Sequence, residues 1–146
     1  MKKLIIHVCF LLISTSTYSG LFIEINHCFE IDSQKNIAFL PNDSIPYTGI
    51  YLCKFDNGKN KIEGSYKNGK FDGNWTTWYD NGQKESEVNY KNGKFDGLSI
   101  WWNKRGQQIR QKEYRNGKLD GKFIEWFQFN GEIKREENYK NGLLIF

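Results

Sequence analysis

The feature that most constrains the fold is an eight-residue stretch, Tyr-Lys-Asn-Gly-Lys-Phe-Asp-Gly at 66–73, that returns along the chain. It recurs nearly unchanged at 90–97 and 114–121, and a truncated copy begins at Tyr139. The leading tyrosines of the four copies are 24, 24 and 25 residues apart. A fixed period of this length predicts one supersecondary unit stacked on copies of itself.

The turn signals within the period indicate the class of structure. Asn-Gly occurs seven times, and the turns fall alternately about 11 and 13 residues apart. Asn-Gly between β-prone runs predicts a hairpin, because both residues accept positive φ at little cost. The intervals leave strands of roughly five to eight residues, and no window offers the length of helical periodicity that a stable helix needs. The predicted fold is all-β, with hairpins laid side by side.

The period of two along each strand assigns side chains to two faces of this sheet. Residues that recur with the scaffold are interpreted as structural: Tyr66, Tyr90, Tyr114, Tyr139, Gly73, Gly97, Gly121, Trp78, Trp102 and Trp126. Trp75 and Trp101 do not recur as tryptophan, which makes them candidates for a binding role, together with Tyr79, Phe123 and Phe127. The alternative is that both aromatic rows are simply the buried faces of a twisting sheet.

The start of the chain has the layout of a secretory signal peptide over residues 1–19. Two lysines precede an apolar run from Leu4 to Ile13, and small polar residues follow up to Ser19. We therefore expect export to the periplasm, cell envelope or exterior; an ordinary buried N-terminal strand or helix is the alternative. Residues 20–45 are interpreted as an N-terminal cap. The repeat domain would span 46–146, with units starting near 49, 73, 97 and 121 and a truncated copy from 139.

Export would also change how the cysteines and the charge are interpreted. Cys9 would leave with the signal, so Cys28 and Cys53 would remain as a possible disulfide, with two free buried thiols as the alternative. Loss of Lys2 and Lys3 would lower the net charge from +4 to +2. So small an excess of positive charge argues against a nucleic-acid partner.

The unit Tyr-x-Asn-Gly-x-Phe/Leu-Asp-Gly, followed after four intervening residues by Trp and a second aromatic residue, resembles the MORN repeat. The variant is similar to that of bacterial proteins grouped as YwqK-type antitoxins, which also share the entry at 46–49, Pro-Tyr-Thr-Gly. The resemblance covers about Pro46 to Leu144. It implies an elongated, twisted antiparallel sheet, a meander of β-hairpin repeats that acts as an interaction module. The antitoxin label implies neutralisation of a toxin by binding in the cytoplasm, and the apparent signal peptide departs from that.

No constellation in the sequence predicts catalysis, a metal site or a cofactor. The chain after residue 19 has one histidine, His27, and zinc needs three or four ligands. Asp72, Asp96 and Asp120 recur, but Asp before Gly is typical of turns, where the side chain bonds to the backbone nearby. The hypothesis is a non-catalytic scaffold that binds a protein partner through an aromatic-lined face or an edge. The alternatives are an exported module that binds lipid headgroups of a membrane surface or cell-wall glycan, and a cytoplasmic antitoxin-like protein if the signal is not cleaved.

Overall fold

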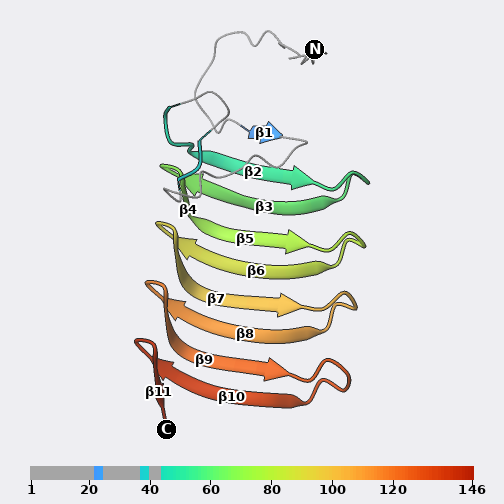
Figure 1. The fold of residues 1–146 in the computed structure, drawn as a ribbon, viewed down its shortest axis with the longest axis vertical. Helices are drawn as coiled ribbons and strands as arrows, with labels where there is room; N and C mark the ends of the chain where they lie inside the picture. Colours follow the sequence, from blue (N-terminus) through green and yellow to red (C-terminus); the bar gives the residue numbers. More distant parts are fainter. Residues whose placement is uncertain (1–21, 25–36, 40–43) are drawn as a thin grey trace, which may run out of the picture.

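The structure, a computed structural model, describes residues 22–24, 37–39 and 44–146. These residues contain no helix and form a single eleven-stranded sheet (Figure 1). The strands are β1 (Phe22–Glu24), β2 (Gly49–Lys54), β3 (Asn60–Lys67), β4 (Lys70–Phe71), β5 (Gly73–Trp78), β6 (Lys84–Lys91), β7 (Lys94–Trp102), β8 (Gln108–Arg115), β9 (Lys118–Trp126), β10 (Ile133–Lys140) and β11 (Leu143–Ile145).

The sheet is an open meander in which neighbours in sequence are neighbours in space. From β2 to β11 every pairing is antiparallel, β1 adds to β2 in parallel, and the short β4 pairs with β3 off the main path. Successive hairpins therefore follow one another along the long axis of the molecule (Figure 1). The prediction of an all-β meander of hairpin repeats is confirmed.

The two long edges of the sheet are built from different turns. At the turn edge, which joins β3 to β4, β6 to β7, β8 to β9 and β10 to β11, each Asn-Gly has both residues at positive φ, as in Asn68 (51°) and Gly69 (72°). This is the two-residue turn that matches strand twist. The opposite edge, which we call the loop edge, joins β2 to β3, β5 to β6, β7 to β8 and β9 to β10, and there only the glycine of each loop has positive φ. In the first of these loops the Gly58 N–H donates to the Phe55 carbonyl at 2.9 Å, which closes a three-residue loop. The expectation of positive φ at both residues is therefore wrong at the loop edge.

The recurring aspartates join consecutive units along the turn edge. The Asp96 carboxylate accepts the Asn116 N–H at 3.0 Å, and the Phe95 carbonyl accepts the Gly117 N–H at 2.7 Å. Asp72 and Asp120 make the equivalent bonds to the next turn, 20 and 21 residues later. The expectation that these side chains bond to backbone nearby in sequence is corrected, because the stacked units bring the next turn closer than the residue's own strand.

Side chains alternate between face A, which carries Tyr51, Trp75 and Phe123, and face B, which carries Trp78, Trp102 and Trp126. The core lies on face A over the first two hairpins and comprises Ala38, Tyr47, Tyr51, Cys53, Tyr66 and Trp75. The Trp75 ring covers Gly64 of the neighbouring strand, where any Cβ would collide with the indole. A glycine in mid-strand thus makes room for the largest core side chain.

A stack of rings continues from this core along face A at the turn edge. Neighbouring rings of Tyr66, Phe71, Tyr90, Phe95 and Tyr114 have centroids 4.9–5.1 Å apart. Burial raises the pKa of the Tyr66, Tyr90 and Tyr114 hydroxyls above the usual value of 10.0. The recurring glycines Gly97 and Gly121 lie inside β7 and β9, where the strand register shifts, and Gly97 has a φ of 104°.

The described residues before β2 cap the first unit by making the hydrogen bonds that a preceding repeat would make. Tyr47 and Thr48 stand one period before Phe71 and Asp72, and they accept the Gly69 and Asn68 N–H groups at 2.7 and 2.8 Å. Ala38, fully buried, adds a further bond from its N–H to the Gly69 carbonyl. The predicted signal peptide at 1–19 and most of the predicted cap at 20–45 lie outside the described residues.

Candidate functional site

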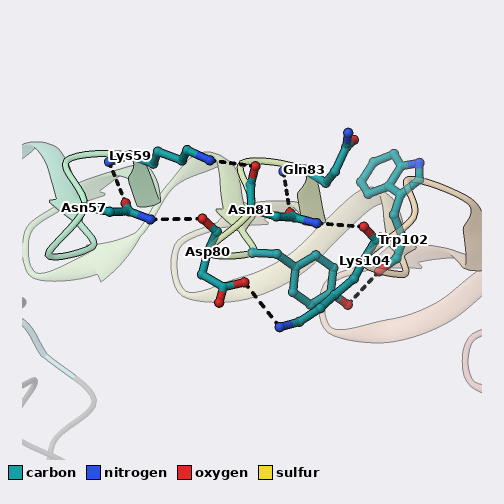
Figure 2. A network of polar contacts seen from close by, with 8 residues as sticks. Asn57, Lys59, Asp80, Asn81, Gln83, Trp102 and Lys104 are labelled. Atoms are coloured by element: carbon teal, nitrogen blue, oxygen red, sulfur yellow. Dashed lines mark hydrogen bonds and ion pairs between the residues drawn. The ribbon is translucent and has the colours of Figure 1, made fainter.

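At the loop edge, side chains rather than backbone join consecutive units (Figure 2). The Asn57 side-chain amide donates to the Asp80 carbonyl at 3.1 Å, and the Asn81 amide donates to the Lys104 carbonyl at 2.8 Å. The oxygen of each of these amides accepts the N–H two residues later in its own loop. One asparagine therefore both shapes its loop and fixes the next one.

This row of asparagines is interrupted at the third unit. Arg105 occupies the equivalent position, and the fourth loop is one residue longer, with Gly131 N–H donating to the Phe127 carbonyl four residues back. Within the described part of the chain, no hydrogen bond joins loop 103–107 to loop 127–132. A hollow of about 410 Å³ lies at the break, lined by Tyr79, Asn103, Lys104, Arg105, Ile109, Gln128 and Phe129.

The last complete unit exposes large apolar side chains around this break. Phe127 is 47% exposed, Phe129 is 90% exposed and Ile133 is 53% exposed. A second hollow of about 210 Å³ also has Phe129 in its lining, together with Ile109 and Trp126. We call the exposed side chains of Phe127, Phe129 and Ile133 the last-unit patch. Phe127 lines the second hollow, Phe129 lines both hollows, and Ile133 pairs with Trp126 where β9 meets β10. Lys104, Arg105 and Lys134 form its basic rim.

Beside the patch, face A carries ion pairs where the first units carry the core. Arg110 contacts Glu125 at 3.0 Å, and Lys134 contacts the same carboxylate at 3.3 Å. The hydrogen bonds from Arg110 and Lys134 hold the pKa of Glu125 below its usual value. The carboxylate is therefore ionised near neutral pH, and it orients both cations at the margin of the patch.

Lys112 links the aromatic residues of this half of face A. Its Nζ lies 5.8 Å from the Trp101 ring centroid and 5.2 Å from that of Phe123, and the Arg135 guanidinium covers Phe123 at 4.9 Å. Burial, and then the charge of Arg110, lower the pKa of Lys112. Cation–π contacts thus occupy ring faces that a ligand would otherwise use.

The structure disperses the five residues predicted to bind. Trp75 and Phe123 are buried on face A, at 7% and 8% exposure. The expected surface position of Trp75 is therefore wrong, because its ring packs over Gly64, which has no side chain to exclude it. Trp101 is partly buried beneath Lys112. Tyr79 lines the hollow at the break, and its hydroxyl donates to the Trp102 carbonyl at 2.9 Å. Phe127 alone is strongly exposed.

Sequence reasoning missed three members of this region: Arg105, Phe129 and Ile133. Two signals marked them, namely the substitution of arginine for asparagine in the turn and the extra residue before Gly131. Both are departures from the repeat, and both lie at one point of the loop edge.

The open backbone edge of the last long strand was also a candidate for binding. β11 pairs with Asn138–Lys140 of β10, and among the described residues the outer edge of β10 from 133 to 137 has no partner strand. That stretch is Ile-Lys-Arg-Glu-Glu. Charged side chains on an edge strand discourage pairing with another chain. We therefore favour the side-chain surface of the last-unit patch over the edge.

Other kinds of site receive little support. Within the described ranges, no group of three His, Cys, Asp or Glu residues is placed to hold a metal ion, and no helix there has the length and apolarity to cross a membrane. Cys53 is fully buried and disulfide-bonded. Cys28 and His27 lie outside the described residues, so Cys28 as the partner of Cys53 stays a prediction.

Two segments of the chain match the model of a known repeat family. The MORN repeat variant model matches residues 71–92 and 124–141, the first running from β4 into the β6–β7 turn and the second from β9 to the β10–β11 turn. A search among curated proteins gives no match. The matched segments are separate copies of the hairpin unit that the whole sheet repeats. Two hairpin units of the sheet therefore match the MORN repeat variant.

Proposed function

We propose that the protein is a non-catalytic repeat scaffold that binds a partner protein through the last-unit patch. Repeats of this type generally serve as modules that bind proteins or membranes. The observation that carries the proposal is the exposure of Phe127 and Phe129 at hollows that a partner's side chains could fill, with Ile133 exposed in the same unit. Aromatic and arginine side chains are enriched at the centre of protein interfaces.

The basic rim defines the chemistry of the expected partner. Lys104 and Lys134 at this surface already pair with Asp80 and Glu125. An apolar segment with an acidic residue placed against Arg105 therefore complements the surface. Complementary rim charges mainly accelerate association and make it depend on salt. Binding should therefore weaken as ionic strength rises, through a slower association rate.

The test is capture of the partner with matched variants. Immobilised full-length protein should retain one stoichiometric protein from the native source, and Phe127→Ser/Phe129→Ser/Ile133→Ser should lose it. The control is Ile50→Ser/Leu98→Ser, which removes two side chains of 39% exposure from face B. Equal capture by wild type and the triple variant would contradict the proposal, as would equal loss in the control.

A membrane surface is the other partner class to be separated from this one. The same variants are sedimented with phosphatidylglycerol vesicles, which would engage Arg105 and Lys134 by charge and Phe129 by insertion. Co-sedimentation that the triple variant abolishes, without any captured protein, would replace the protein partner by a lipid surface.

An antitoxin-like role would be a special case of protein binding and would require that residues 1–19 stay on the chain in the cytoplasm. Export would require their removal. The mass of the protein isolated from its native source distinguishes the two, because cleavage after Ser19 removes a defined N-terminal segment.

A further inference from the structure

Face B carries a groove that the last-unit patch does not use. It lies over the first two hairpins, has a volume of about 430 Å³, and is lined by Glu63, Ser65, Asn74, Thr76, Trp78 and Glu87, together with Ile50, Gly64 and Lys84. No described element packs against this face, because the described residues form a single sheet. The groove combines polar side chains with the apolar surfaces of Ile50 and the Trp78 indole.

The polar groups of the groove are held in place by one another. The Asn74 side-chain amide donates to Glu87 Oε1 at 3.0 Å, and the Thr76 hydroxyl donates to Asn74 Oδ1 at 3.1 Å. Lys84 Nζ contacts Glu87 Oε2 at 2.6 Å. Each of these bonds leaves further donor or acceptor capacity on hydroxyl, amide or carboxylate. Groups fixed before a ligand arrives lose less freedom on binding.

The charge of the groove selects against anions. Lys84 offsets Glu87, and Glu63 remains as an exposed carboxylate without an opposing cation among the groove residues. Phosphates, nucleic acids and acidic sugars would be repelled. A neutral polyhydroxylated ligand suits acceptors and donors of both kinds and can lay an apolar C–H face on an indole.

The indole of Trp78 is the first of a periodic row along face B. Trp78, Trp102 and Trp126 pair with Lys84, Gln108 and Ile133 at the same position of successive hairpins. All three are partly exposed. Equivalent positions two strands apart are separated by roughly 9–10 Å. In an extended β-1,4-linked glycan every second sugar presents the same face, and a disaccharide spans close to this distance.

We propose that face B binds a neutral, linear β-linked glycan, with Trp78 as the stacking platform beside the polar groove. Trp102, whose ring centroid lies 5.9 Å from Lys84 Nζ, would become the next platform along the chain when a sugar displaces that lysine. Asn74, Thr76 and Glu87 would bond to the hydroxyls of the sugar on Trp78. The site lies on the opposite face from the core and includes no residue of the last-unit patch, so it stands independently of the proposed protein partner.

The test uses calorimetric titration and tryptophan fluorescence of the full chain with cellohexaose and chitohexaose, two neutral β-1,4 hexasaccharides. Either should bind and should bind more tightly than its trisaccharide, because the longer chain reaches two platforms. Trp78→Ala should weaken binding about tenfold, the usual order for one lost aromatic anchor. The matched control is Trp101→Ala, adjacent to Trp102 in β7 but on face A.

Asn74→Ala and Thr76→Val keep the test valid if Trp78→Ala unfolds. Asn74 is exposed, and Thr76→Val removes a hydroxyl that donates to the Asn74 side chain while the backbone pairing of Thr76 stays. Each substitution should weaken binding of the hexasaccharide without changing the melting temperature of the protein. Maltohexaose, whose α-linkages curl the chain, should bind more weakly. The proposal is overturned by no binding of either β-linked hexasaccharide at millimolar concentration, by equal affinity for maltohexaose, or by equal loss in Trp101→Ala.

Discussion

The first and last units of this sheet share one backbone and differ in what they place upon it. Trp75 and Phe123 occupy the same position two periods apart, and both are nearly buried. Around Trp75 lie Tyr51 and Tyr66, whereas Phe123 lies beneath Lys112 and Arg135. The same scaffold position thus supports a closed aromatic core at one end and a charged, open surface at the other.

The difference teaches which residues decide each property. Turn glycines, asparagines and aspartates repeat and fix the hairpin and its junction with the next one. Non-repeating residues such as Gly64, Arg105 and Phe129 decide whether a unit becomes core or surface. Stability should therefore concentrate in the first units, and binding should concentrate where repetition stops.

The largest expected effect is on the core. Trp75→Ala should lower the free energy of unfolding by about 3–5 kcal/mol, because it removes the central ring and leaves a cavity. Phe123→Ala should cost about 2 kcal/mol, close to the transfer term alone, since the overlying cations can close the gap. Urea denaturation of both variants measures the contrast. Equal losses would mean that the two ends are equally packed.

The junctions between units should have a smaller effect. Asp96→Ala removes a charged acceptor from the Asn116 N–H and should cost about 1 kcal/mol. Asp80→Ala removes a solvent-exposed ion pair with Lys104 and should leave the free energy of unfolding nearly unchanged. The urea midpoints of the two variants, measured side by side, test whether the recurring aspartates join units. Identical midpoints would contradict that role for Asp96.

The tyrosine stack should make the fold sensitive to alkali. The pKa values of Tyr66, Tyr90 and Tyr114 are raised by burial, so above pH 10 the unfolded chain loses protons that the folded chain keeps. Stability is then fully present below pH 10 and falls as the pH rises through the raised values. Urea midpoints at pH 8 and pH 11, with absorbance titration of the tyrosines, should show the loss. Ionisation of all eight tyrosines near pH 10 would contradict it.

The smallest expected effect on folding belongs to the last-unit patch. Phe129 is 90% exposed, so Phe129→Ser should change the free energy of unfolding by less than about 0.5 kcal/mol. Thermal melting of this variant beside Phe123→Ala measures the difference within one unit. A large loss for Phe129→Ser would make the phenylalanine a packing residue and weaken its assignment to a binding surface.

Most of the fold could be predicted from the sequence, and less of the site. The repeated Asn-Gly turns, of which Asn68-Gly69 is one, predict the hairpins because turn chemistry is local. Each further copy at the same spacing strengthens that prediction. The burial of Trp75 could not be predicted, since it depends on Gly64 lying opposite in a register that only the assembled sheet defines. The exposure of Phe129 likewise depends on a loop whose extra residue has no equivalent in the other units.

The most direct test of the account is site-specific photo-crosslinking in the native source. A photoreactive phenylalanine analogue replaces Phe129 in one variant and Phe55, the partly buried aromatic residue that begins the first loop of the same edge, in another. The account predicts one discrete protein adduct from position 129 and none from position 55. Adducts of equal yield at both positions, or none at 129, would contradict a binding surface at the last unit.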